Sequence, residues 1–267
     1  MLHLSKIKPA FSLLTLLLLV TVSCTSSKTI QYENVPIQRA QIELTEEQLL
    51  DVGILIFDPN LPEEDQEFIF PEIRKAEARY IPYHLKATLE DTGFWGGVWV
   101  LPEKSEAMDL IVGGRIEVSN GLKVAVRIGV WDITGREWMN KVYETTVSRS
   151  AYSQQRDYSQ DPYQSFYNKI ANDLLNIRNS LSSPELRRIS EIGDLRFAAE
   201  LVPGVYSDYL MQDEKDIFSA KRLPSENDEM MGRIQNVKER EFVLVDTLNE
   251  YYAKLYQDIS VPYENWR

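Results

Sequence analysis

Residues 109–135 read DLIVGGRIEVSNGLKVAVRIGVWDITG and hold the clearest strand pattern of the chain. Polar and apolar residues alternate on both sides of Asn120-Gly121, a pair that favours a tight hairpin turn. Residues 132–135 predict a second turn, and residues 138–147 then read as another strand. The run therefore predicts an antiparallel meander.

The segments on either side of this run add two strands and two helices. Residues 51–59 and 94–102 are short β-branched and aromatic stretches that predict strands. Residues 70–92 have helical spacing, with Pro82 expected to kink or divide the helix. Asp161-Pro162 is typical of a helix start, and one apolar stripe follows it: Phe166, Ile170, Leu174, Ile177 and Leu181.

The chain is predicted to have two folded parts. Residues 45–181 contain the strands and both helices, which indicates an α+β fold: a mixed, mostly antiparallel sheet with two packing helices. Ser182-Ser183-Pro184 marks a boundary, and residues 182–267 read as a helical C-terminal extension. We expect residues 45–181 to fold without this extension.

The longest predicted helix opens at Leu223-Pro224-Ser225, with Ser225 and Asp228 as an approximate capping box. Apolar residues recur along it at steps of three and four: Met230, Ile234, Val237, Leu244, Leu248, Tyr251 and Leu255. The default interpretation is a helix that packs this stripe on its own domain. The alternative is a coiled-coil or partner-docking helix. The aromatic end of the chain, residues 261–267, is expected either to dock on the domain or to serve as a recognition peptide.

Three short motifs carry a resemblance to a known fold. They are Asp109–Gly114, Val130–Gly135 and Lys169–Leu175, within residues 50–181. With this element order, the region resembles the N-terminal domain of the Tol-system propeller proteins and the fold of the curli-secretion lipoproteins. The resemblance implies the fold rather than the function, because the chain has neither the propeller nor long amphipathic transmembrane hairpins.

Cys24 is the only cysteine, and it follows a signal-like segment. Lys6 and Lys8 precede the apolar run Leu13–Val20, and Ser23 is the small residue before the expected cut. This segment resembles the lipobox of bacterial lipoproteins, which implies a diacylglyceryl thioether and an N-acyl chain on Cys24. We therefore expect a signal peptide at residues 1–23 and a lipidated tether at residues 24–44.

Composition narrows the function classes. The chain has a net charge of -12, which disfavours nucleic acid and an anionic membrane surface. His3 lies in the expected signal and His84 is the only other histidine, so we expect no metal site, no cofactor and no catalytic triad. Nothing in the sequence marks a catalytic pair of carboxylates such as Asp109 and Asp132, although this possibility stays open.

These observations predict a non-enzymatic adaptor. Neither Thr25 nor Ser26 is the aspartate that retains lipoproteins of enteric bacteria in the inner membrane. Resemblance to that rule implies a lipid anchor in the outer membrane, from which the protein would face the periplasm. An envelope protein is the expected partner, in assembly, export or a surface structure, and a homo-oligomer is a further option. The alternative is a carbohydrate- or peptidoglycan-binding protein that uses clustered tryptophans. The candidate interaction residues are Trp95, Trp99, Tyr263 and Trp266.

Overall fold

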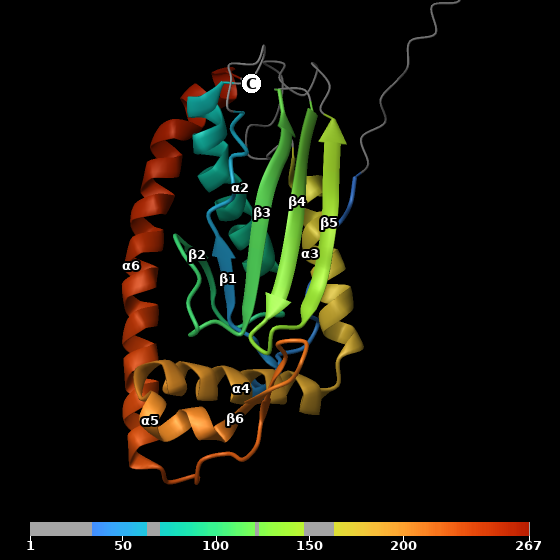
Figure 1. The fold of residues 1–267 in the computed structure, drawn as a ribbon. Helices are drawn as coiled ribbons and strands as arrows, with labels where there is room; N and C mark the ends of the chain where they lie inside the picture. The colour runs from blue at the N-terminus through green and yellow to red at the C-terminus, as the bar shows by residue number, and fades with distance from the viewer. Residues whose placement is uncertain (1–33, 63–69, 121–122, 147–162, 267) are drawn as a thin grey trace, which may run out of the picture. The chain divides into compact units, whose positions relative to one another are not determined.

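The structure is a computed structural model that describes residues 34–62, 70–120, 123–146 and 163–266, with side chains up to residue 258. These residues belong to one compact unit. Its main sheet has the strand order β2-β1-β3-β4-β5 (Figure 1). The five strands, in chain order, are β1 (Val52–Leu55), β2 (Val98–Leu101), β3 (Leu110–Ser119), β4 (Lys123–Asp132) and β5 (Glu137–Thr146).

The predicted fold class is confirmed. β3, β4 and β5 form the expected antiparallel meander, while β1 pairs in parallel with both β2 and β3. The backbone of Asn120 donates to the Lys123 carbonyl at 3.2 Å, so the β3–β4 hairpin closes where Asn120-Gly121 predicts it. Gly135, with φ of 98°, adopts the left-handed conformation in the turn between β4 and β5.

Two helices cover one face of the sheet, as predicted: α2 (Pro71–Thr92) and α3 (Gln164–Ser180) (Figure 1). Their apolar residues share one core with the alternate strand residues, for example Leu85 and Ile170 with Ile54 and Val126. Because these residues are almost completely buried, this core is the main source of hydrophobic stabilisation.

Pro82 does not divide α2, contrary to one of the predicted outcomes. A proline has no backbone N–H, so the carbonyl of Ala78, one turn earlier, loses its helical partner. In this fold the Ala78 carbonyl accepts a hydrogen bond from the Phe57 backbone N–H at 2.8 Å. The Ala78 carbonyl therefore binds the segment after β1 to α2, and the helix continues through Pro82.

The predicted tether is partly bound to the domain. The backbone N–H of Gln38 donates to Asn172 Oδ1 at 3.0 Å, and the Asn172 amide donates to the Pro36 carbonyl at 2.9 Å. Ala40 N–H donates to the Thr92 carbonyl at 2.8 Å. Residues 36–40 thus lie against α3 and the end of α2, whereas residues 24–33 lie outside the described chain.

The C-terminal part consists mainly of helices, as expected, with elements that the sequence did not indicate. α4 (Ser183–Leu201) begins with the predicted cap, in which Glu185 accepts from the Ser182 backbone. A short helix, α5 (Pro203–Tyr206), and a single 3-10 turn follow, and then the β6 (Leu210–Gln212) and β7 (Phe218–Ala220) hairpin, which sequence analysis missed. Strands of three residues are too short to show a period, which explains the omission.

The last helix, α6, spans Glu229–Trp266, which is 38 residues. The predicted start at Leu223-Pro224-Ser225 is wrong, because Asp228 caps the helix by accepting from the backbone N–H groups of Met230 and Met231. A second hydrophobic cluster joins α6 and α4 to the sheet face opposite α2 and α3. It includes Trp99, Ile111, Leu195 and Val245.

The shared cores generate a prediction about domain organisation. Leu186 of α4 is buried in the same core as α2 and α3, so Leu186→Ala should lower the free energy of unfolding by about 2–5 kcal/mol. Leu201→Ala, on the exposed end of the same helix, should change it by less than about 0.5 kcal/mol. Urea denaturation followed by circular dichroism measures both. Equal small effects would mean that residues 45–181 are stable without α4, as the sequence suggests.

Candidate functional site

α6 packs against α4 and β2 and also has a run of exposed apolar side chains. One side of it, which we call the inner stripe, faces the domain; its buried residues are Ile234, Lys238, Val245, Asn249 and Tyr256. Half-buried Phe242 belongs to the same side, where its ring stacks on Trp99 with 4.7 Å between centroids. Trp99 Nε1 also donates to Asp246 at 2.6 Å.

Asn249 holds α6 against the edge of the sheet. β2 is an edge strand, so its outer N–H and C=O groups have no neighbouring strand to pair with. The Asn249 side chain supplies both partners: its Oδ1 accepts from Val100 N–H at 2.9 Å and its Nδ2 donates to the Val100 carbonyl at 3.1 Å. The amide thus makes the two hydrogen bonds that a neighbouring strand would make with Val100, and it fixes the rotation of α6 about its axis.

A buried charge cluster holds the first half of α6. Lys238 Nζ lies 3.0 Å from Asp194 Oδ1 of α4, and it also interacts electrostatically with Asp109 and Asp51. Asp109, at the start of β3, accepts from the Asp51 backbone N–H at 3.0 Å. Its other carboxylate oxygen is buried and has no hydrogen-bond partner among the described residues. The cluster thus joins two strands and two helices.

The cluster shifts three pKa values. Burial raises the pKa of Asp109 to about 7, despite the opposing charge of Lys238. Burial also raises the pKa of Asp51, against the hydrogen bond from the Gly97 N–H. Burial alone lowers the pKa of Lys238, but the carboxylates of Asp194, Asp109 and Asp51 outweigh it, so the pKa is raised. Structural ion networks produce such shifts as readily as catalytic sites do.

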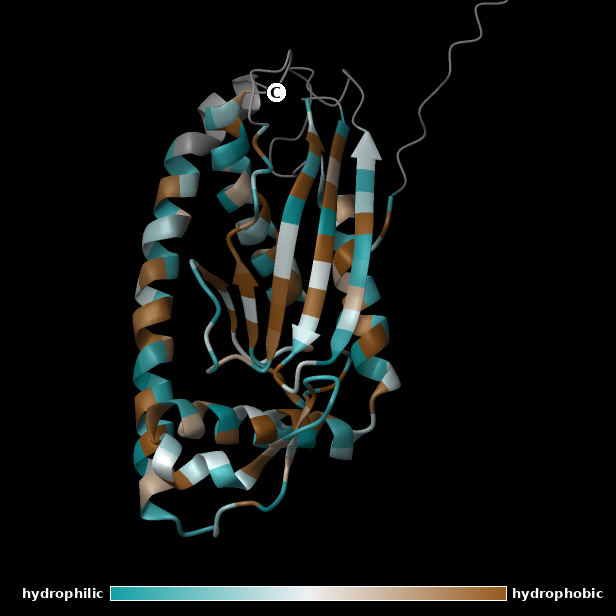
Figure 2. Cartoon of the chain, viewed as in Figure 1, coloured by the Kyte–Doolittle hydropathy of each residue, from teal (hydrophilic) through white to brown (hydrophobic). Residues whose placement is uncertain are grey.

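The apolar stripe predicted from the sequence lies mostly on the solvent side of α6. Of its seven residues only Ile234 is buried. The other six, which we call the outer stripe, are exposed, with Leu244 at 61% and Tyr251 at 71%: Met230, Val237, Leu244, Leu248, Tyr251 and Leu255. The expectation that this stripe packs on the domain is therefore wrong. Hydrophobic residues recur along all of α6 (Figure 2), and burial separates them into two stripes.

The two tryptophans named as interaction candidates are not at the surface. Trp95 is 6% exposed and belongs to the core under α2, and Trp99 is 8% exposed and belongs to the core under α6. α6 continues through Tyr263 and Trp266, whose side chains lie outside the described residues, as does Cys24. Of the predicted interaction residues, none is thus placed on a described surface.

Among the tryptophan side chains described, Trp131 is the most exposed, at 38%. Its ring occupies the space above Gly129 and beside Gly113, where a Cβ atom at Gly129 would lie within 2.3 Å of the ring. Trp138 instead donates its Nε1 to Asp132 at 2.7 Å in the β4–β5 turn. The described residues therefore do not form a groove with two exposed tryptophans, which would favour the carbohydrate alternative.

Asp109 and Asp132 do not form a catalytic pair, because each is engaged separately. Asp109 belongs to the buried cluster with Lys238. Asp132 accepts from the Thr134 backbone at 3.0 Å and pairs with Arg136 at 3.2 Å within its own turn. These contacts stabilise the turn between β4 and β5.

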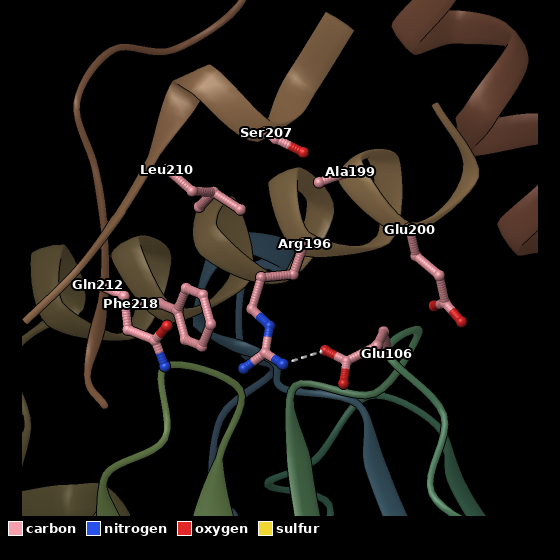
Figure 3. A pocket seen from close by; sticks show the side chains of 8 residues that line it. All are labelled: Glu106, Arg196, Ala199, Glu200, Ser207, Leu210, Gln212 and Phe218. Atoms are coloured by element: carbon pink, nitrogen blue, oxygen red, sulfur yellow. Dashed lines mark ion pairs between the residues drawn. The ribbon is translucent and has the colours of Figure 1, made fainter. Parts of the chain in front are cut away.

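An open pocket of about 430 Å³ lies between α4 and the β6–β7 hairpin (Figure 3). Arg196 is its central cation. The guanidinium donates to the Ile133 carbonyl at 2.6 Å, pairs with Glu106 at 2.7 Å and lies 4.1 Å from the Phe218 ring centroid. Since protein groups already surround this charge, the pocket offers little to an anionic ligand.

Comparisons with known proteins leave the family open. No family model matches the chain, and no match is found among curated proteins. The resemblance to the Tol-system and curli-secretion proteins therefore stays a prediction. Within the described ranges, no cluster of three or more His, Cys, Asp or Glu side chains is placed to hold a metal ion. No helix in the described part of the chain has the length and apolarity of a membrane span.

The charge cluster generates a pH prediction. Between pH 3.8, which is the ordinary pKa of the group, and about pH 7, Asp109 keeps a proton in the folded protein that the unfolded chain releases. The contribution of Asp109 to the free energy of unfolding should therefore fall as the pH rises through this window. In the variant Asp109→Asn, residue 109 does not titrate. The free energy of unfolding of the variant minus that of the wild type should therefore rise by on the order of a few kcal/mol from pH 4 to pH 7.

Denaturant unfolding at several pH values measures this difference. Asp208→Asn, an exposed substitution on a neighbouring element, is the control, and its curve should run parallel to that of the wild type. If Asp109→Asn also runs parallel, Asp109 is already ionised in the folded protein and the proton assignment is wrong.

Proposed function

We propose that this chain is a non-enzymatic adaptor, anchored by lipid on Cys24 to the outer membrane and facing the periplasm. The outer stripe of α6 is the contact surface for an envelope protein. One observation carries the proposal: six apolar residues are exposed in a row on a helix that is already fixed to the domain. Contiguous exposed apolar surface of this kind is typical of interaction sites.

The attachment of α6 makes such a contact favourable. Lys238, Phe242 and Asn249 hold the inner stripe over about three turns, so the outer stripe is presented on a helix that needs no ordering when a partner binds. A preorganised surface avoids part of the entropic cost of association. By contrast, the other sheet edge, β5, exposes Glu137, Lys141 and Glu144, and charges on an edge strand oppose the addition of a further strand.

The contact surface can be tested by photo-crosslinking in cells. A photoreactive amino acid at Leu248 or Leu255 should crosslink to a single defined envelope protein. The same amino acid at Val243, which is 65% exposed but lies outside the outer stripe, should not. If all three positions crosslink equally, or if none does, the outer stripe is not the contact surface.

A triple variant separates binding from stability. Leu244→Gln, Leu248→Gln and Leu255→Gln together should abolish that crosslink from a probe placed at Tyr251. The thermal midpoint should stay close to that of the wild type, because all three side chains are exposed and glutamine is nearly as good a helix former as leucine. A large loss of stability would mean that the outer stripe is part of the core.

The anchor is tested separately. Cys24→Ser should move the protein from the membrane fraction to the periplasmic fraction, because the acyl chains supply the membrane affinity. Ser26→Ala, two residues further along, should leave it in the membrane fraction. A free Cys24 thiol in the wild-type protein, measured by mass spectrometry, would overturn the lipid anchor without affecting the contact surface.

A further inference from the structure

The outer stripe follows a seven-residue repeat. Met230, Val237, Leu244 and Tyr251 recur every seven residues. A second row begins with Ile234, which is buried, and continues outward with Glu241, Leu248 and Leu255. Two interleaved rows of this kind form the narrow seam of a coiled coil, whereas a helix that lies on a membrane presents a broader apolar face. The repeat therefore indicates a second helix along the outer stripe.

A row of basic residues borders this seam on the solvent side. Arg233, Arg240 and Lys254 lie at positions of the same seven-residue repeat, with Thr247 in the fourth place. All three are exposed, and none forms an ion pair with another described residue. At about 100° per residue they lie next to the outer stripe, on the side away from the inner stripe. Charges in such a row select the partner of a coiled coil.

We infer that the outer stripe binds an amphipathic helix of another protein whose apolar seam is bordered by Asp or Glu. The inference rests on the proposed function and names the partner's chemistry. Acidic side chains on the partner would pair with Arg233, Arg240 and Lys254 across the seam. The chain as a whole has a net charge of -12, so the sign of the basic row is opposite to that of the protein.

A second copy of this chain fits the surface less well. In an antiparallel pair the basic row would face the same basic row, and like charges there repel. In a parallel pair it would face Met231, Lys238, Val245 and Tyr252, of which Lys238 and Val245 are buried against the helix's own domain. Neither arrangement supplies an acidic row.

Glu241 occupies the one polar place in the seam. Its carboxylate accepts from the Ser105 hydroxyl at 2.5 Å, which draws the side chain back toward the β2–β3 connection. A single polar residue in a coiled-coil seam fixes the register at a cost in stability. The partner helix is therefore expected to stop or to place a polar residue opposite Glu241.

The test uses the purified full-length protein and two designed peptides. Each peptide has about 28 residues, or four heptads, with leucine in the seam except for one asparagine opposite Glu241, and with either glutamate or lysine beside the seam. Fluorescence anisotropy at low and high salt measures binding. The glutamate peptide should bind about tenfold more tightly than the lysine peptide at low salt, and salt should reduce the difference.

Charge reversal should exchange the preference. The variant Arg233→Glu, Arg240→Glu, Lys254→Glu should bind the lysine peptide in preference to the glutamate peptide. The control Lys215→Glu, Lys221→Glu changes exposed charges outside α6 and should keep the wild-type preference. Equal binding of the two peptides by the wild type would overturn the acidic-helix inference, while the crosslinks at Leu248 and Leu255 would still support the adaptor.

Two other binding partners of the outer stripe, a second copy of this chain and a membrane surface, would give different experimental results. A dimer in sedimentation that Leu248→Gln, Leu255→Gln abolishes would assign the surface to a second copy. Flotation of the Cys24→Ser protein with phosphatidylglycerol vesicles, lost in the same variant, would assign it to a membrane surface. Either result would overturn the inference, and neither is expected.

Discussion

The buried ammonium of Lys238 is the contact on which the placement of α6 depends. It lies 3.0 Å from Asp194 and interacts with Asp109 and Asp51, so one cation joins α6 to α4, β3 and β1. A buried charge without partners is far more costly than an exposed one, which makes other rotations of α6 unfavourable. Burial is the main cause of the raised pKa of Asp109, and the charges of Asp51 and Asp194 add to it, while Lys238 opposes it.

Backbone groups that lack a partner place the other elements. Pro82 leaves the Ala78 carbonyl free in α2, and Phe57 after β1 donates to it at 2.8 Å. Val100 on the edge strand β2 would face solvent with both its N–H and its C=O, and Asn249 of α6 pairs with both. In each case a local gap in hydrogen bonding is closed by a residue far away in the sequence, because buried polar groups must be paired. These two contacts therefore help to orient α2 and α6 relative to the sheet.

Features that depend on neighbouring residues could be predicted from the sequence, whereas contacts between distant residues could not. The meander, the turn at Gly135 and the capping of α4 by Ser182 follow from neighbouring residues, and all three are confirmed. The parallel pairing of β1 with β2 and β3 is non-local, and no residue spacing indicates the strand order.

The prediction of which side of α6 is buried was wrong for a related reason. α6 has apolar residues on two sides, and periodicity alone does not tell which side is buried. Asn249 and Lys238, both buried on the inner stripe, are the signal that could have identified it, because polar residues within an apolar face indicate specific partners.

The two stripes of α6 divide the requirements of folding and binding between them. The inner stripe combines apolar packing with Lys238 and Asn249, so it holds the helix through contacts that only this domain supplies. The outer stripe has no such polar anchors, and its leucines are interchangeable with those of many coiled-coil seams. A seam of that composition has affinity but little specificity, so the discrimination between partners falls to the residues beside it. In this chain those residues are Arg233, Arg240 and Lys254, which makes charge, rather than shape, the property that selects what α6 binds.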